Sequence, residues 1–268
     1  MNKFGFKVVD ERAAALGPVL DYAVDRGLPV EVGLYFSDRD ALALLERRLA
    51  DTGVPVNAHS DHGRYHAFNF DRTRGLLEEH IRLARQLGSA YSIVHTGASP
   101  MTQRPSRQSA LFRLLVDNLA RAEDLCTALD YRLHLENVYH PLAFYRELFA
   151  AIQRQGLRRI HFCFDIGHAK IWSSESLDDW LNFLDELVRE GFALHFHLHA
   201  NRGFADEHLA LAEAQALAIA EPDDYYNPYG YPGAFRKVGE RFPDAVKIFE
   251  VKLEQAIPNL EATINPSS

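Results

Sequence analysis

The sequence predicts an α/β protein whose eight parallel strands and intervening helices close into a (β/α)8 TIM barrel. Short apolar runs alternate with longer amphipathic segments, eight of the short runs are strand candidates, and glycine follows several of the helical segments. An open doubly wound sheet is the main alternative. That fold normally carries a glycine-rich phosphate turn after its first strand, and "VVDERAAALG" is not such a turn.

The expected strands and helices follow each other along the whole chain. The strand candidates span 4–9, 29–35, 54–59, 91–97, 132–137, 161–167, 193–200 and 246–252. Helical patterns separate them, and the last separating helix is expected to include 206–220. Five of the helical patterns end at a glycine, as a helix C-cap does: Gly27, Gly53, Gly88, Gly156 and Gly191. Since no linker or repeat interrupts this order, we expect residues 1–268 to form a single TIM-barrel domain.

Composition narrows the class of protein and its partners. The chain has 268 residues, of which 47% are hydrophobic, and its formal net charge is −8. An acidic chain without a Lys/Arg run disfavours nucleic acid as a partner. Cys126 and Cys163 do not make a disulfide framework, which suits a reducing cytoplasm. The N-terminal stretch does not resemble a secretory signal, and no run of about 18 apolar residues predicts a membrane partner.

Side chains able to bind a metal occur at the carboxyl end of six successive strand candidates. In a barrel these ends converge on one mouth, where active sites are built. One such residue alone is usually structural, but packing does not explain six strands with the same feature. The residues are His59, His95, Glu136, Asp165, His197 with His199, and Glu250.

The seventh strand candidate places three histidines on one face, because side chains alternate along a strand. His195 would lie deepest, as a hydrogen-bonded core histidine. His197 would lie at the level of a metal ligand. His199 would lie at the rim, either as a ligand, as a substrate contact or simply in solvent.

Charge predicts a cation at this mouth. Glu136, Asp165 and Glu250 would bring about three negative charges together, and such carboxylates need a counter-charge to stay ionised. Lys252 and Lys170 are near in sequence, and Lys252 would share the face of Glu250 and compensate in part. A divalent cation is the simpler solution. Mixed imidazole and carboxylate ligands suit zinc, manganese, cobalt or iron better than magnesium.

Four motifs in this order resemble the xylose isomerase-like TIM barrels, a superfamily of sugar isomerases and epimerases that also includes endonuclease IV. They are "HLEN" (134–137), "FDIGH" (164–168), "HLHANRGFADEH" (197–208) and "FEVK" (249–252). Resemblance to the epimerases implies one metal held by Glu136, Asp165, His197 and Glu250. It also implies that Glu136 and Glu250 act as acid and base beside a carbonyl, with His168 as a substrate contact.

Resemblance to endonuclease IV implies a different centre with three zinc ions. The additional ligands would be His59, His95, His168, Asp206 and His208. Many relatives have Asp at the position of Ala200 and a Gly-x-Gly turn after the Asp-x-His pair, and this chain has neither. Asp206 and His208 are therefore either ligands or the first turn of a helix. The number of ions stays open between one and three.

The function expected from these residues is a metal-dependent sugar isomerase or epimerase with a small-molecule substrate. One divalent ion among three carboxylates gives the site a net charge of about −1, which suits a neutral polyol or ketose. Three divalent ions among four carboxylates give a net charge of about +2, which suits a phosphate. The alternatives are a multi-zinc phosphoester hydrolase and, less favoured, a barrel that binds without catalysis. Candidate substrate contacts are His168, His199, Arg202, Asn137 and Trp172.

Two groups of aromatic residues can each be interpreted either as structural or as functional. Tyr35, Tyr139 and Trp172 lie near strand ends, where they either stack on a sugar or pack the barrel rim. The Tyr-rich stretch 221–233 favours a packed loop or an oligomer contact over an aromatic wall of the site. A homodimer is consistent with this stretch, but the sequence leaves the oligomeric state open.

Overall fold

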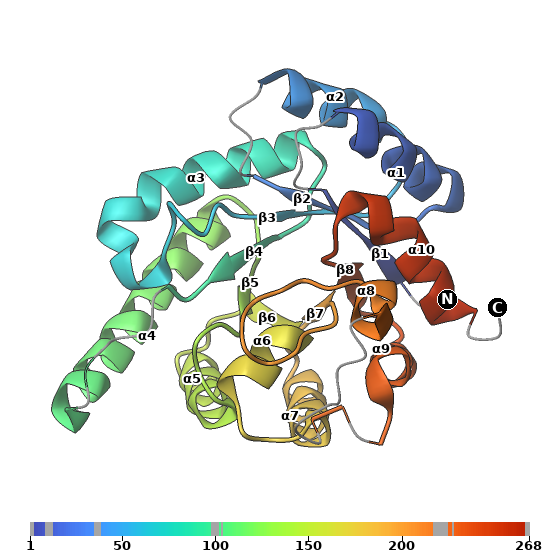
Figure 1. Cartoon of the computed structure of the whole chain (residues 1–268). Helices are drawn as coiled ribbons and strands as arrows, with labels where there is room; N and C mark the ends of the chain where they lie inside the picture. The colour runs from blue at the N-terminus through green and yellow to red at the C-terminus, as the bar shows by residue number, and fades with distance from the viewer. Residues whose placement is uncertain are drawn as a thin grey trace.

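Eight parallel strands close into a barrel in the order β1 to β8, and β8 pairs with β1 (Figure 1). The computed structural model describes residues 3–8, 13–34, 39–97, 102, 104–216, 225–226 and 228–265. The (β/α)8 prediction is confirmed, and each predicted strand overlaps an observed one. The strands are β1 (Lys3–Val8), β2 (Val30–Gly33), β3 (Val56–His59), β4 (Ser92–His95), β5 (Leu133–Glu136), β6 (Ile160–Asp165), β7 (Leu194–Leu198) and β8 (Val246–Phe249).

Helices surround the strands on the outside of the barrel (Figure 1). The glycines expected as C-caps have positive φ, as at Gly27 (62°) and Gly191 (91°), which confirms their role in ending helices. The helices are α1 (Ala13–Arg26), α2 (Arg39–Leu49), the 3-10 turn η1 (Ala67–Asn69), α3 (Phe70–Gln86), α4 (Pro105–Ala128), α5 (Leu142–Arg154), α6 (Ile166–Trp172), α7 (Leu177–Arg189), α8 (Leu211–Ala216), α9 (Gly230–Arg241) and α10 (Leu253–Ile264). Among the described helices, none has the length and apolar character to cross a membrane.

The main apolar core lies between the helices and the outer face of the barrel. Helix α7 illustrates how the sequence builds it: Ser176 and Asp179 form a capping box, and the apolar positions that follow at helical spacing are buried. Trp180 and Phe183 of α7 contact aromatic rings of β6, with centroids 5.3 Å from Phe164 and 5.9 Å from Phe162 respectively. Each fully buried large side chain stabilises the fold by roughly 1.5–3 kcal/mol.

The interior of the barrel is unusually polar. TIM barrels normally fill this space with branched apolar side chains. Here the buried set includes Glu31, Asn57, His59, His134, Glu136, Asp165, His195, His197 and Glu250. Burying ionisable groups is costly unless they are paired or bind a cation, so this interior indicates a functional site.

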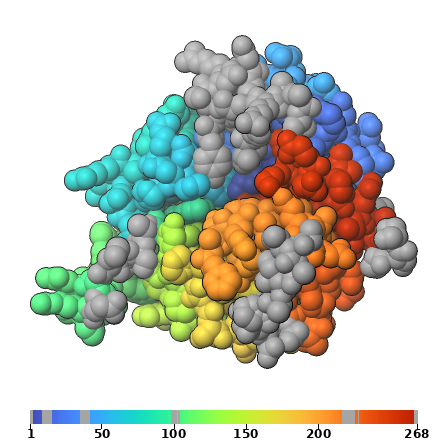
Figure 2. Space-filling model, in the orientation of Figure 1, coloured from blue at the N-terminus to red at the C-terminus, as the bar shows by residue number. Residues whose placement is uncertain are grey.

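The segment after β7 differs from the helix expected over 206–220. Residues 200–209 form a loop closed by an antiparallel bridge between Ala200 and Leu209, and α8 begins only at Leu211. This loop lies in front of β7 and α6 in Figure 1 and covers the middle of the face seen in Figure 2. Residues 217–220 of the expected helix are outside the described residues.

Candidate metal centre

Three carboxylates gather around one nitrogen atom of His197, and the four residues come from consecutive strand ends. Glu136 ends β5, Asp165 ends β6 and pairs in register with His197 of β7, and Glu250 follows β8. The Nδ1 atom of His197 lies 3.4 Å from Glu136 Oε1, 3.4 Å from Glu250 Oε1 and 3.9 Å from Asp165 Oδ2. All four side chains are buried. The structure therefore brings together the ligand set expected for a single ion.

The chemistry of this donor set fits a divalent cation. His197 Nδ1 is buried and makes no hydrogen bond, while its Nε2 hydrogen-bonds Glu31 Oε2 at 3.1 Å. Zinc binds imidazole nitrogen and carboxylate oxygen at about 2.0–2.2 Å, so ligand atoms on a shared ion stand roughly 3–3.5 Å apart. The separations around His197 Nδ1 are close to this range, and Glu136, Asp165, His197 and Glu250 are the residues that would hold the ion.

A second group of imidazoles lies on the β3 and β4 side of Glu136. His59 Nε2 and His95 Nε2 are each 3.0 Å from Glu136 Oε2. His59 Nδ1 donates to the Ser60 carbonyl at 2.8 Å, and burial lowers the pKa of His59 to about 4. His59 Nε2 faces a carboxylate oxygen, and a cation between the two atoms would bind both of them.

His62 joins this second group, and the sequence analysis missed it. Its ring stacks on His95 with centroids 4.8 Å apart, and nitrogen atoms of His59, His62 and His95 all lie within 4.8 Å of one another. The signal was present in the sequence, because His62 follows the strand-end residue His59 by only three positions.

A third group lies on the β6, β7 and β8 side. His168 Nδ1 is 3.1 Å from Glu136 Oε1, and His168 Nε2 is 3.2 Å from Asp206 Oδ2. His208 Nε2 is 3.0 Å from Asp206 Oδ1, and His208 Nδ1 is 3.3 Å from Glu250 Oε2. The interpretation of Asp206 and His208 as a helix start is wrong, because His208 has a φ of 49° and α8 begins after it. The structure brings these side chains to the centre instead.

His199 is fully buried, so the interpretation that it is simply solvated is wrong. Its Nε2 lies 3.2 Å from both carboxylate oxygens of Asp165, and its ring stacks on His208 with centroids 4.3 Å apart. Gly167 makes this approach possible, because a Cβ there would lie 2.1 Å from His199 Cε1. A glycine at the start of α6 thus leaves the space that the imidazole fills.

The cation nearest the carboxylates is Lys7 of β1. Its ammonium pairs with Glu250 and lies 3.5 Å from Glu31 Oε1. Lys252 does not share this site, contrary to expectation: its side chain is exposed and pairs with Glu213 at 2.7 Å. Lys170 lies over the Tyr226 ring, with its Nζ 4.8 Å from the ring centroid.

Glu31 of β2, like Lys7, was not predicted from the sequence. Burial alone would raise the pKa of this carboxyl, but His197 and Lys7 hold its pKa well below the usual value. The sequence did contain a sign of it, because Glu31 is the single acidic residue in the otherwise apolar second strand candidate. Lys7 is likewise the single basic residue in the first strand candidate.

The remaining residues predicted to contact substrate lie in different surroundings. Asn137 Nδ2 donates to the Asp165 carbonyl at 2.9 Å, and Asn137 Oδ1 accepts from the Asp165 N–H at 2.6 Å, so Asn137 fixes the backbone of Asp165. Arg202 pairs with Glu207. Trp172 is 44% exposed and meets Tyr139 edge-on at 5.3 Å, and Tyr139 has a positive φ of 67°. Tyr35 lies outside the described residues.

The Tyr-rich stretch is partly described and packs against the loop after β7. Tyr225 and Tyr226 are buried, and Tyr231 donates to the Asn201 carbonyl at 3.0 Å. These contacts agree with a packed loop, and residues 221–224 and 227 are outside the described residues.

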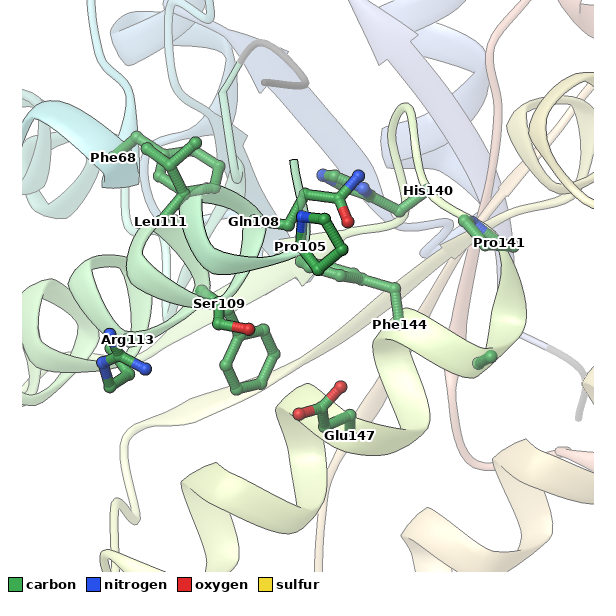
Figure 3. A pocket seen from close by; sticks show the side chains of 12 residues that line it. Phe68, Pro105, Gln108, Ser109, Leu111, Arg113, His140, Pro141, Phe144 and Glu147 are labelled. Carbon is green, nitrogen blue, oxygen red and sulfur yellow. The ribbon is translucent and has the colours of Figure 1, made fainter. Parts of the chain in front are cut away.

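A separate cavity of about 710 Å³ lies between α4 and α5 (Figure 3). Phe68, Phe112, His140 and Phe144 contribute to its walls. None of its lining residues belongs to the ligand groups described above. We place the chemistry at the barrel mouth, because the buried carboxylates and imidazoles lie there.

A closed parallel barrel with carboxylates and imidazoles gathered at its carboxyl mouth defines a class of barrels suited to hold divalent metals. The chain belongs to the xylose isomerase-like TIM barrel family, whose pattern it matches over residues 13–252. No curated protein matches the sequence.

Solved structures share this fold over nearly their whole length. The TTHB071 protein from Thermus thermophilus, studied after soaking with ZnCl2, is 22% identical with a TM-score of 0.69, and 99% of each chain is covered. A D-tagatose 3-epimerase-like protein is 18% identical with a TM-score of 0.67, covering 99% of this chain and 100% of its own. The 3-keto-D-glucoside 4-epimerase of E. coli is 14% identical with a TM-score of 0.62, and 98% of each chain is covered. Sugar epimerases are therefore among the proteins with this fold.

Proposed function

We propose that this protein is a divalent-metal-dependent isomerase or epimerase that acts on a sugar or a related polyol or keto compound. The observation that carries the proposal is the convergence of Glu136, Asp165 and Glu250 on His197 Nδ1, with all four side chains buried. The epimerases among the similar structures support the substrate class.

The two glutamates are suited to move protons. They come from β5 and β8, which are not adjacent in the barrel, so a substrate carbon between them would be reached from two directions. Glu136 or Glu250 removes a proton beside the substrate carbonyl, and the other returns one. A metal held at this centre would polarise the substrate oxygens. Zinc, manganese, cobalt and iron all suit the ligands.

The rim supplies groups for holding the substrate. The exposed Trp172 and Tyr139 form an edge-to-face pair, and aromatic faces bind the apolar face of a sugar ring. The positive φ of Tyr139 is a conformation that non-glycine residues seldom adopt, which supports a functional role for this pair. His168 lies beside Glu136, where a substrate hydroxyl would hydrogen-bond, whereas His199 is fully buried against Asp165.

A multi-zinc phosphoester hydrolase is the second candidate, favoured by one observation. His59 and His95 meet Glu136 on one side, and His168, Asp206 and His208 form a linked group on the other. Three ions would leave the pocket positive and suited to phosphate. The formal charge of −8 argues against a nucleic-acid substrate, and we therefore prefer the small-molecule reaction.

Solvent exchange tests the proposal. Metal-free protein is loaded with Mn²⁺ or Zn²⁺ and incubated in D₂O with unphosphorylated ketopentoses and ketohexoses, and the sugars are analysed by mass spectrometry. We expect at least one sugar to gain deuterium at a carbon next to its carbonyl, and chelated protein to give none. Failure of every sugar to exchange, together with cleavage of a phosphodiester, would assign the hydrolase instead.

A further inference from the structure

A buried group of polar side chains continues below the candidate metal centre into the barrel. Its middle member is Glu31 of β2, which is 0% exposed. Glu31 Oε2 accepts hydrogen bonds from Asn57 Nδ2 at 2.8 Å and from His197 Nε2 at 3.1 Å, and His195 Nε2 lies 3.0 Å away. Three nitrogen atoms therefore surround a single carboxylate oxygen.

The contacts fix which nitrogen of His197 carries hydrogen. An ionised carboxylate only accepts hydrogen bonds, so Nε2 of His197 carries a hydrogen and Nδ1 is the nitrogen left to bind a cation. His195 repeats the arrangement one level lower, because the Tyr91 hydroxyl lies 2.8 Å from its Nδ1. Nδ1 of His197 is the atom that faces Glu136, Asp165 and Glu250.

We propose that Glu31 is a positioning residue that fixes the ring orientation and tautomer of His197 and thereby sets the affinity of the centre for a divalent ion. The inference rests on the metal centre of the proposed function, and it assigns Glu31 a role without making it a ligand. A carboxylate behind a ligating imidazole holds the ring and increases its basicity, and losing such a partner typically costs 10–100-fold in metal affinity.

Cobalt binding tests this role without any assay of activity. Metal-free wild type, Glu31→Gln and Tyr91→Phe are titrated with Co²⁺ and followed by its visible absorption. Tyr91→Phe is the matched control, because it alters the same buried group but leaves the contact between Glu31 and His197. We expect Glu31→Gln to raise the Kd about 10–100-fold, Tyr91→Phe to change it little, and all three to share one saturated spectrum. Nitrogen-15 NMR of the zinc form should show hydrogen on Nε2 of wild-type His197.

Several results would overturn the inference. An unchanged Kd in folded Glu31→Gln, or an equal loss in Tyr91→Phe, removes the positioning role. A changed saturated spectrum or one fewer bound ion makes Glu31 a ligand. If Glu31→Gln does not fold, Glu31→Asp retracts the carboxylate by one methylene, and an unchanged Kd there counts equally against it. Wild type that binds no Co²⁺ overturns the centre as well, whereas Co²⁺ binding without deuterium exchange overturns only the proposed reaction.

Discussion

His197 Nδ1 lies 3.4 Å from Glu136 Oε1 and at the same distance from Glu250 Oε1, although Glu136 ends β5 and Glu250 follows β8, with two other strands between β5 and β8. Both proposed proton-transfer groups thus lie at a common point beside one imidazole nitrogen. Substitutions at the individual residues can therefore test the role of each one separately.

Glu136→Gln and Glu250→Gln should each lower turnover by at least about 10²–10⁴-fold, because an amide cannot take and return the proton. The fold should survive, since glutamine keeps the size of the side chain. Deuterium exchange measures the rate, and circular dichroism checks folding. A variant that keeps a near-normal rate while retaining its metal would show that the acid and base assignment is wrong.

His197→Gln should abolish the tightest binding of Zn²⁺ because it removes the nitrogen that faces three carboxylates. His208→Gln should keep the tightest ion, since His208 is partly exposed and its nitrogen atoms face Asp206 and the far oxygen of Glu250, Oε2, rather than Glu250 Oε1 beside His197 Nδ1. Elemental analysis after dialysis gives the ions bound per chain. Equal loss in the two variants would contradict a primary site at His197.

Gly167→Ala should displace His199 from Asp165, because the added Cβ would meet the imidazole at 2.1 Å. We expect a loss of about 1–3 kcal/mol in the free energy of unfolding. Gly75→Ala in α3 is the control, because nothing lies within 4 Å of its Cβ position, and it should stabilise by about 0.5–1 kcal/mol. Urea unfolding measures both. Equal effects would mean that Gly167 has no special packing role.

Acid should destabilise the metal-free protein between pH of about 6.5 and 4, in part through His161 of β6. Burial, with Arg132 and Arg159 nearby, lowers the pKa of His161 to about 4, and its Nδ1 accepts from the Ala193 N–H at 3.2 Å. In this window the unfolded chain binds a proton that the folded chain does not, so stability is present above about pH 6.5 and lost as the pH falls.

His161→Asn should weaken this pH dependence, because the asparagine oxygen can accept from the Ala193 N–H without titrating. The number of protons taken up on unfolding in this pH range should fall by up to about one. Urea unfolding in EDTA at several pH values measures the slope. The same slope in wild type and variant would exclude His161 as a contributor.

The sequence predicted the barrel and most of the centre because both depend on local patterns. Strand and helix periodicity located all eight strands, and the strand-end rule placed Glu136, Asp165 and His197 at one mouth. Glu250 kept its place beyond β8 because its N–H still bonds the Leu198 carbonyl at 3.2 Å.

The predictions that were wrong or missing depend on contacts between segments that are distant in the sequence. Lys252 was expected on the face of Glu250, but β8 ends at Phe249 and strand alternation does not continue to it. Asp206 and His208 belong to a loop fixed by the pairing of Ala200 with Leu209, which no local pattern predicts. Lys7 and Glu31 were single charges in apolar strands, and their partners are far away in the chain.

The ion pair between Lys7 and Glu250 joins the first strand to the last, across 243 positions of sequence. During synthesis on the ribosome, β1 emerges long before the carboxylate that its ammonium will contact. The nascent chain therefore brings Glu250 to His197 only after β8 has docked, so an ion that needs both residues would be captured only at the final stage of folding.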